Sequence, residues 1–114
     1  MSEELSMEQA LKLWRGALVE SVRKDGPDLS ARQMAILLTV YGEPPPHTVR
    51  GLAAHLNISK PAVTRALDTV GRLGFLRRKR DETDGRNILV QRTIKGVIFL
   101  SEFSDLIKEH VKQL

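Results

Sequence analysis

Cysteine is absent from this chain of 114 residues. Its absence excludes disulfide bonds, thiolate metal sites and cysteine-based redox sensing. No apolar run approaches the roughly 20 residues that a bilayer-spanning helix needs. The N-terminal residues also lack the basic and then apolar segments of a signal peptide. We therefore expect a cytoplasmic protein that does not bind membranes.

The sequence also lacks the residue patterns of enzymes and metal sites. There is no cysteine nucleophile, no cluster of carboxylates near a histidine and no glycine-rich phosphate loop. The three histidines, His47, His55 and His110, are far apart and follow no metal-ligand spacing. We therefore predict no catalytic activity, no cofactor and no metal site.

Positive charge is present in excess, and it is concentrated in one part of the chain. The formal net charge is +4. From His47 to Thr93, ten Lys and Arg residues stand against four acidic residues, a net charge of +6. The remainder has eight basic and ten acidic residues, a net charge of −2. A basic segment of this kind is the electrostatic footprint of nucleic-acid binding.

The stretch from Thr48 to Leu73 has the pattern of two short helices joined by a tight turn. Thr48 can cap the first helix, because its hydroxyl can accept a hydrogen bond from a free backbone N–H. Asn57 tolerates the left-handed conformation that turns the chain sharply. Ser59 can cap the second helix, and Pro61 lies in its first turn, where a missing N–H costs little. Apolar residues recur at helical spacing on both sides of the turn, as in a helix-turn-helix.

The second of these helices, residues 59–73, carries small, hydrogen-bonding and basic side chains opposite its apolar stripe, as a helix in a DNA major groove requires. Arg65 and Thr64 are the best candidates for base-edge contacts, since arginine can pair with guanine through two hydrogen bonds. Ser59 and Lys60 lie at the N-terminus of the helix, where free N–H groups favour a phosphate. The alternative is the solvated face of an ordinary helical hairpin. The predicted DNA contacts on this helix are Ser59, Lys60, Ala62, Thr64, Arg65 and Thr69.

A β-hairpin is predicted directly after this helix. Phe75 begins a strand that continues through residues 77–80, and residues 87–91 form an alternating return strand. The Asp84-Gly85 pair between them is a turn signal. A hairpin that follows a helix-turn-helix is a wing, here residues 75–92. Because side chains alternate along a strand, we expect only half of the basic residues 77–80 to face phosphates. The predicted DNA contacts on the wing are Arg77, Arg78 and Arg86.

The predicted elements give an α+β fold that is mainly helical, with a two-stranded wing. A capping box at Ser6 begins a first helix, and a second capping box at Ser30 begins another. We treat residues 1–114 as one winged-helix domain, with a DNA-binding lobe over residues 30–92. The apolar face of the helix after Ser30 is expected to consist of Met34, Leu37, Leu38 and Tyr41.

Amphipathic helices are predicted at both ends of the chain, over residues 6–24 and 94–113. Their apolar faces are wider than a chain of this length can readily cover by itself, so we expect them to form a homodimer interface. The residues predicted for this interface are Leu11, Trp14, Leu18, Phe103, Leu106 and Ile107.

The segment from Leu29 to Gly96 resembles the MarR family of bacterial winged-helix regulators. The resemblance lies in the order and spacing of LSARQ at 29–33, LAAHLNIS at 52–59, VTR at 63–65, LGFLRR at 73–78, DGR at 84–86 and TIKG at 93–96. The chain departs from the family at two points. Arg92 stands where the family usually has leucine, and the sequence ends at Leu114, whereas family members commonly continue through a further helix.

The resemblance implies a sequence-specific transcriptional regulator that binds double-stranded DNA as a homodimer. We expect a repressor of a pseudo-palindromic operator, with residues 59–73 in the major groove and residues 75–92 at the minor groove. Arg86 resembles the family's minor-groove arginine, with Asp84 or Asp81 as its holding partner. In the family the terminal helices build the dimer interface, and a pocket for small acidic or aromatic effectors lies next to it. An unidentified effector is therefore a further expected partner.

The competing prediction is a winged-helix protein-interaction module, such as an antirepressor, that does not bind DNA itself. Such a module does not need a lobe with a net charge of +6, and one that mimics DNA would be acidic. The charge distribution therefore favours the DNA-binding regulator.

Overall fold

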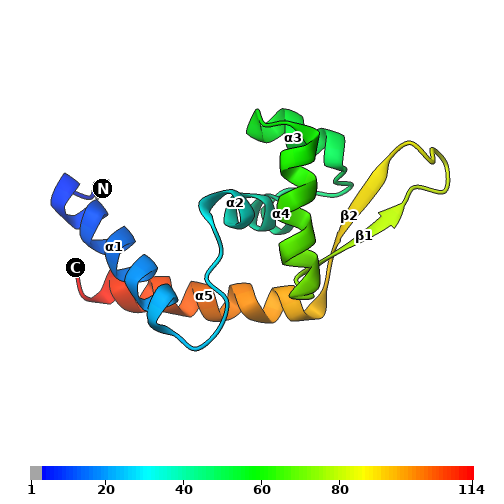
Figure 1. Cartoon of the computed structure of the whole chain (residues 1–114). Helices are drawn as coiled ribbons and strands as arrows, with labels where there is room; N and C mark the ends of the chain where they lie inside the picture. The colour runs from blue at the N-terminus through cyan, green and yellow to red at the C-terminus, as the bar shows by residue number, and fades with distance from the viewer. Residues whose placement is uncertain (1–3) are drawn as a thin grey trace. The chain divides into compact units, whose positions relative to one another are not determined.

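The computed structural model describes residues 4–114, which form five helices and one two-stranded antiparallel sheet (Figure 1). The elements in chain order are α1 (Met7–Arg23), α2 (Ala31–Gly42), α3 (Val49–Leu56), α4 (Lys60–Arg72), β1 (Leu76–Arg80), β2 (Ile88–Arg92) and α5 (Ile94–Lys112). This is the mainly helical α+β winged-helix fold that the sequence predicts.

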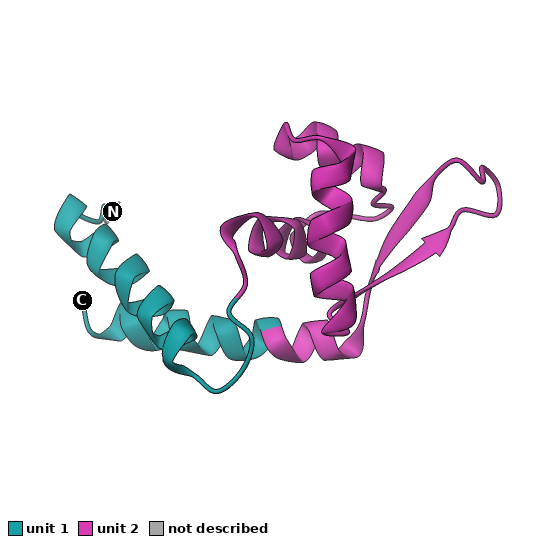
Figure 2. Cartoon of the chain, viewed as in Figure 1, with its two compact units in different colours: residues 1–28, 100–114 teal, residues 29–99 magenta. Residues whose placement is uncertain are grey.

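The chain divides into two compact units (Figure 2). One unit consists of residues 1–28 and 100–114, and therefore holds α1 and most of α5. The other unit consists of residues 29–99 and holds α2, α3, α4, the hairpin and the first residues of α5. The predicted DNA-binding lobe, residues 30–92, lies entirely within this second unit.

Both predicted capping boxes are present. The Ser6 hydroxyl accepts a hydrogen bond from the Gln9 N–H, and the Gln9 side chain accepts one from the Ser6 N–H, each at 3.0 Å. Ser30 and Gln33 make the same reciprocal pair at 3.1 and 2.9 Å. Each pair satisfies a backbone donor that a helix N-terminus leaves free, which explains why α1 and α2 begin where they do.

The core of unit 29–99 is formed by α2 and α3 packing against α4. Its fully buried large side chains are Ile36, Leu37, Val40, Leu52, Val63, Leu67 and Val70. The predicted inner face of α2 was wrong in part, because Leu38 is 47% exposed while Ile36 and Val40 are completely buried. The predicted and observed sets both follow helical spacing, so the period alone cannot select the face that packs.

Unit 1–28 with 100–114 buries Ala17, Phe103 and Leu106. The His110 ring lies close to Gly16 of α1, where an added Cβ would stand 2.8 Å from the ring atom Cε1. His110 Nε2 lies 3.2 Å from a Glu20 carboxylate oxygen, which joins α5 to α1 by a polar contact. In residues 4–114, no helix combines the length and the apolar character needed to cross a membrane.

Candidate nucleic-acid interface

The helix-turn-helix is built by α3, α4 and the turn between them. The Thr48 hydroxyl accepts a hydrogen bond from the Gly51 N–H at 2.9 Å and so caps α3. Asn57 follows with φ 55° and ψ 47°, the left-handed conformation that turns the chain. The Ser59 hydroxyl accepts from the Ala62 N–H at 3.1 Å and caps α4. These contacts confirm the predicted caps and the predicted turn.

The α4 helix buries one side in the core of its unit and leaves the other side exposed. Val63 and Leu67 are almost completely buried, and Ala66 is 5% exposed. Ala62 lies on the same side and is 6% exposed, so its prediction as a DNA contact is wrong. A small residue suited the pattern of a groove-facing helix, but at this position its small size allows close packing of α4 instead.

The other predicted contacts on α4 remain accessible. Ser59, Lys60, Thr64 and Arg65 are exposed, and Thr69 is half-buried. Arg65 and Thr69 also line a surface hollow of about 550 Å³, together with residues 30–33 at the N-terminus of α2. The hollow thus brings the Arg65 side chain next to a helix N-terminus. Both carry positive charge or partial positive charge, so both favour a negatively charged group there.

An ion pair that was not predicted from the sequence joins α4 to the wing. Arg78 Nη2 lies 2.7 Å from an Asp68 carboxylate oxygen, and the two side chains are 37% and 50% exposed. Arg78 is therefore tied to α4 and is not free on the strand. The sequence could have indicated this pair, since Asp68 is the only acidic residue between Lys60 and Leu76.

The wing is a regular antiparallel hairpin in which Leu76 is opposite Arg92 and Arg80 is opposite Ile88. The four basic residues from Arg77 to Arg80 are all exposed, while Leu76 is buried. Arg77 Nη2 donates to the Gln91 side-chain oxygen at 3.1 Å across the sheet. The strand therefore presents basic side chains on both faces of the hairpin, with two of its guanidinium groups held by neighbouring side chains.

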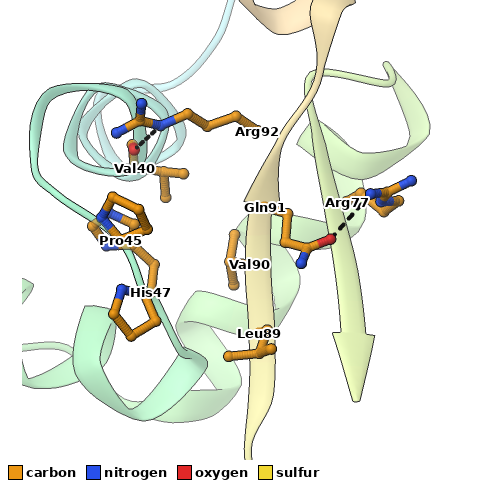
Figure 3. A pocket seen from close by; sticks show the side chains of 9 residues that line it. Val40, Pro45, His47, Arg77, Leu89, Val90, Gln91 and Arg92 are labelled. Atoms are coloured by element: carbon orange, nitrogen blue, oxygen red, sulfur yellow. Dashed lines mark hydrogen bonds between the residues drawn. The ribbon is translucent and has the colours of Figure 1, made fainter. Parts of the chain in front are cut away.

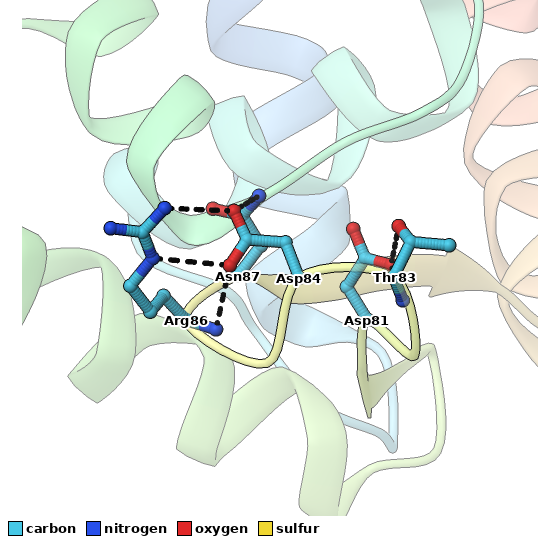
Figure 4. A network of polar contacts seen from close by, with 5 residues as sticks. All are labelled: Asp81, Thr83, Asp84, Arg86 and Asn87. Carbon is cyan, nitrogen blue, oxygen red and sulfur yellow. Dashed lines mark hydrogen bonds and ion pairs between the residues drawn. The ribbon is translucent and has the colours of Figure 1, made fainter.

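The tip of the wing holds Arg86 in place (Figure 4). Arg86 Nε lies 3.1 Å from an Asp84 carboxylate oxygen, and the same carboxylate accepts from the Arg86 backbone N–H at 3.2 Å. Of the two residues predicted to hold Arg86, Asp84 is the one that contacts it. The Arg86 side chain is still 85% exposed, so its guanidinium is accessible to a ligand while its stem is oriented.

Asp81, the other candidate partner, stabilises the turn instead (Figure 4). Its carboxylate accepts from the Thr83 hydroxyl at 2.7 Å and from the Thr83 N–H at 3.0 Å. These hydrogen bonds, the hydroxyl first, lower the pKa of Asp81 below its ordinary value of 3.8. The Asp81 carboxylate therefore stays ionised to a lower pH than a free aspartate, because its pKa is lowered, and its hydrogen bonds keep the first half of the tip in a turn.

The base of the wing is joined to α2 by a polar cluster around Tyr41. Its hydroxyl donates to the Phe75 carbonyl at 2.7 Å or the Thr93 carbonyl at 3.0 Å and accepts from the Thr93 N–H at 2.9 Å. The Thr93 hydroxyl donates to the Gly74 carbonyl at 2.7 Å. It also accepts from the Gly96 N–H at 3.0 Å, so Thr93 caps α5. These bonds fix both strand ends where they enter and leave the wing.

Only part of the predicted dimer interface is exposed. In α1, Leu11, Trp14 and Leu18 are 59%, 51% and 43% exposed, which leaves them available to a partner. In α5, Phe103 and Leu106 are 9% and 6% exposed, so their assignment to the interface is wrong. Their side chains are already buried within one chain. Ile107 is half-buried.

Basic side chains dominate the surface of the lobe. All ten Lys and Arg residues between His47 and Thr93 are exposed. Two of the four acidic residues, Asp68 and Asp84, are within ion-pair distance of arginines. Within residues 4–114, no group of three or more His, Asp or Glu side chains could hold a metal ion. The arrangement suits an extended polyanion better than a small cation.

Known proteins share this architecture. A family model described as MarR family matches residues 28–87. The transcriptional regulator BldR from Sulfolobus solfataricus is 29% identical, with a TM-score of 0.65 over 94% of this chain and 77% of that chain. A MepR mutant from S. aureus is 20% identical, with a TM-score of 0.77 over 97% of this chain and 86% of that chain.

A structure of an S. aureus MepR–DNA complex is also similar in fold. It is 19% identical, with a TM-score of 0.72 over 93% of this chain and 82% of that chain. No curated protein matches the chain. The family match covers the helix-turn-helix and most of the wing, and the solved structures extend the similarity in fold to nearly the whole chain.

Proposed function

This chain belongs to the MarR family, and on that basis we propose that it is a transcriptional regulator that binds double-stranded DNA in a sequence-specific manner. The observation that carries the proposal is the exposed basic surface of the lobe, where all ten Lys and Arg residues between His47 and Thr93 are accessible and the net charge of that segment is +6. A surface of this kind binds phosphates and releases the counterions that surround DNA.

The α4 helix is the element that we propose to enter the major groove. Its exposed side offers Thr64 and Arg65 for base edges, and its N-terminus offers Ser59 and Lys60 for a phosphate. The core packs only the opposite side of α4, so the exposed side can approach DNA without unfolding the lobe.

The wing is the element that we propose to reach the neighbouring minor groove. A narrow A·T-rich minor groove concentrates negative potential and attracts an arginine. Arg86 suits this role because its side chain is 85% exposed while Asp84 orients it. Its readout would therefore depend on groove width more than on individual bases.

We propose that the regulator acts as a homodimer and represses genes by covering a pseudo-palindromic operator. The exposed apolar residues of α1 support the dimer, because Leu11, Trp14 and Leu18 would remain in water in a monomer. A two-fold symmetric protein places two α4 helices on two half-sites, which matches a pseudo-palindrome.

The test compares Arg65→Ala and Arg86→Ala in a competition binding assay, with Arg23→Ala of α1 as a control of equal charge change. We expect Arg65→Ala to lose roughly 1–3 kcal/mol on the preferred site and less on random DNA. We expect Arg86→Ala to lose the preference for A·T-rich flanks while the core preference remains.

Two results would contradict the proposal. If both variants weakened all sequences equally, the two arginines would contact only phosphates. If the unmodified protein bound no duplex even at low salt, the winged-helix protein-interaction module would replace the regulator as the better interpretation. Binding that becomes weaker with salt, by a slope of about −0.9 for each neutralised phosphate, is the expected behaviour.

A further inference from the structure

The C-terminal end of α2 lacks a positive charge of its own. The last carbonyl groups of a helix have no partner within the helix, and they form the negative end of its dipole. Both properties favour a nearby cation. No basic residue lies in the last turn of α2, all of which the structure describes. A cation for this helix end has to come from elsewhere in the chain.

Arg92, the last residue of β2, supplies that cation (Figure 3). Its Nε donates to the Val40 carbonyl at 2.8 Å, and its Nη2 donates to the Glu43 carbonyl at 2.9 Å. The guanidinium carbon also lies 5.8 Å from the centre of the Tyr41 ring, within the range of a cation–π interaction. One side chain thus joins the end of the wing strand to the end of α2 through two charge-assisted hydrogen bonds.

The surroundings of Arg92 are incompletely packed. A cavity of about 350 Å³ lies beside Arg92, and its lining includes residues 45–47, in the connector before α3, and residues 89–92 of the wing strand (Figure 3). Polar links therefore contribute much of the attachment of β2 at this point. One of them is the hydrogen bond from the Val90 N–H to the His47 carbonyl at 2.8 Å. The β-bridge between Thr48 and Leu89 and the two bonds of Arg92 are further links.

We infer that Arg92 is a positioning residue for the wing, which clamps the base of β2 to α2 and so determines where Arg86 is held relative to α4. Arg92 is at the far end of β2 from the wing tip, and it directs its donors to protein carbonyls. An apolar side chain at this position could make neither bond. The DNA-binding consequence of this role depends on the proposed function, whereas the clamp itself does not.

The clamp is tested without DNA by hydrogen exchange of Arg92→Met. Methionine keeps an unbranched apolar stem like that of arginine but removes the charge and both hydrogen bonds. We expect the Val90 amide to exchange about tenfold faster or more, because the strand beside the cavity opens locally. Exchange of the α4 core amides of Leu67 and Val70 should not change. Arg92→Lys should give an intermediate result, since one ammonium group reaches both carbonyls less well than a planar fork.

The consequence for DNA binding is tested by a double-mutant cycle on A·T-rich and G·C-rich flanks. We expect Arg92→Met to reduce the flank preference by about the same factor as Arg86→Ala, and the double variant to reduce it no further. Lys79→Met, on the same hairpin, is the control for loss of one wing charge. It should weaken binding to both flanks equally and leave the flank preference unchanged.

Each arm has a result that would overturn the inference. An unchanged Val90 exchange rate in Arg92→Met would show that the clamp does not hold the strand. Faster exchange throughout α4 would show that Arg92 stabilises the whole lobe and not the wing. If the clamp were present but Arg92→Met behaved like Lys79→Met on DNA, Arg92 would act as an ordinary phosphate contact. If no variant and no wild-type protein bound DNA, the proposed function would fail while the exchange result remained valid.

Discussion

Replacing Gly96 with alanine is expected to destabilise the lobe strongly, although the change adds only one methyl group. A Cβ on Gly96 would overlap the Tyr41 hydroxyl and the Phe75 carbonyl oxygen, and it would stand 2.7 Å from Tyr41 Cζ. Phe75 contributes a backbone atom, and the Tyr41 hydroxyl donates to the Phe75 or the Thr93 carbonyl and accepts from the Thr93 N–H. Moving Phe75 would shift the backbone, and moving Tyr41 would break its hydrogen bonds, so either movement costs free energy.

The size of the effect follows from these contacts. Overpacking of a filled site costs about 1–3 kcal/mol. Displacement of Tyr41 would add about 1–3 kcal/mol, because the polar groups at Phe75 and Thr93 would lose their partner. We therefore expect Gly96→Ala to lower the free energy of unfolding by roughly 2–6 kcal/mol, a large share of the 5–15 kcal/mol typical of a domain.

Chemical denaturation followed by circular dichroism measures this loss, with two variants for comparison. Gly42→Ala is the matched control, since nothing lies within 4 Å of its added Cβ. It should be neutral or more stable by about 0.4–1 kcal/mol, because alanine restricts the unfolded chain. Tyr41→Phe removes the hydroxyl that the new methyl group would meet, so the double variant should cost less than the sum of the two single variants.

The reasoning would be refuted if Gly96→Ala and Gly42→Ala had the same stability within about 0.5 kcal/mol. That result would mean that Tyr41 and the strand entry adapt easily to a larger side chain. The wing base would then be a soft joint, and a glycine at this position would need another explanation.

Three further predictions concern the DNA-binding surface, the turn at the wing tip and the proposed dimer. Asp68→Asn should strengthen DNA binding and steepen its salt dependence by up to about 0.9, because it removes a negative charge and frees Arg78, as titrations at several salt concentrations can show. Thr83→Val should raise the pKa of Asp81 towards 3.8 in an NMR titration. In the unmodified protein the lowered pKa adds stability that is present above about pH 3.8 and is lost as the pH falls through the folded pKa. The free energy of unfolding of the variant should therefore fall less on acidification. Sedimentation should show a dimer that Trp14→Glu shifts towards the 12.8 kDa monomer, whereas a monomer before substitution would contradict the proposed dimer.

The ion pairs of the interface have two effects on the bound state. Arg78 and Arg86 are each held by a carboxylate, Asp68 and Asp84, which orients the guanidinium groups before DNA arrives. Orientation in advance reduces the conformational entropy that binding has to remove. The same carboxylates would repel phosphates in the proposed complex, so we expect the held arginines to contribute less to affinity than free ones. We expect the arrangement to favour discrimination between sequences over tight binding to all of them.

Local features of the sequence determined the elements and their order. Ser6, Ser30, Thr48 and Ser59 each cap a helix by accepting from a backbone N–H three residues later, so a short stretch of sequence is enough to recognise them. Asn57 turns the chain for an equally local reason, its tolerance of the left-handed conformation. The wing was predictable because its strands are joined by a short loop with a turn signal.

Only the tertiary structure decided which side chains are buried and which residues meet. Ala62, Phe103 and Leu106 were predicted to contact a partner but lie in the core, because helical spacing marks a face without saying what covers it. The bonds of Arg92 to α2 join residues that are 49 and 52 positions apart in sequence. Such contacts depend on how the elements pack in three dimensions, and no local pattern of residues predicts them.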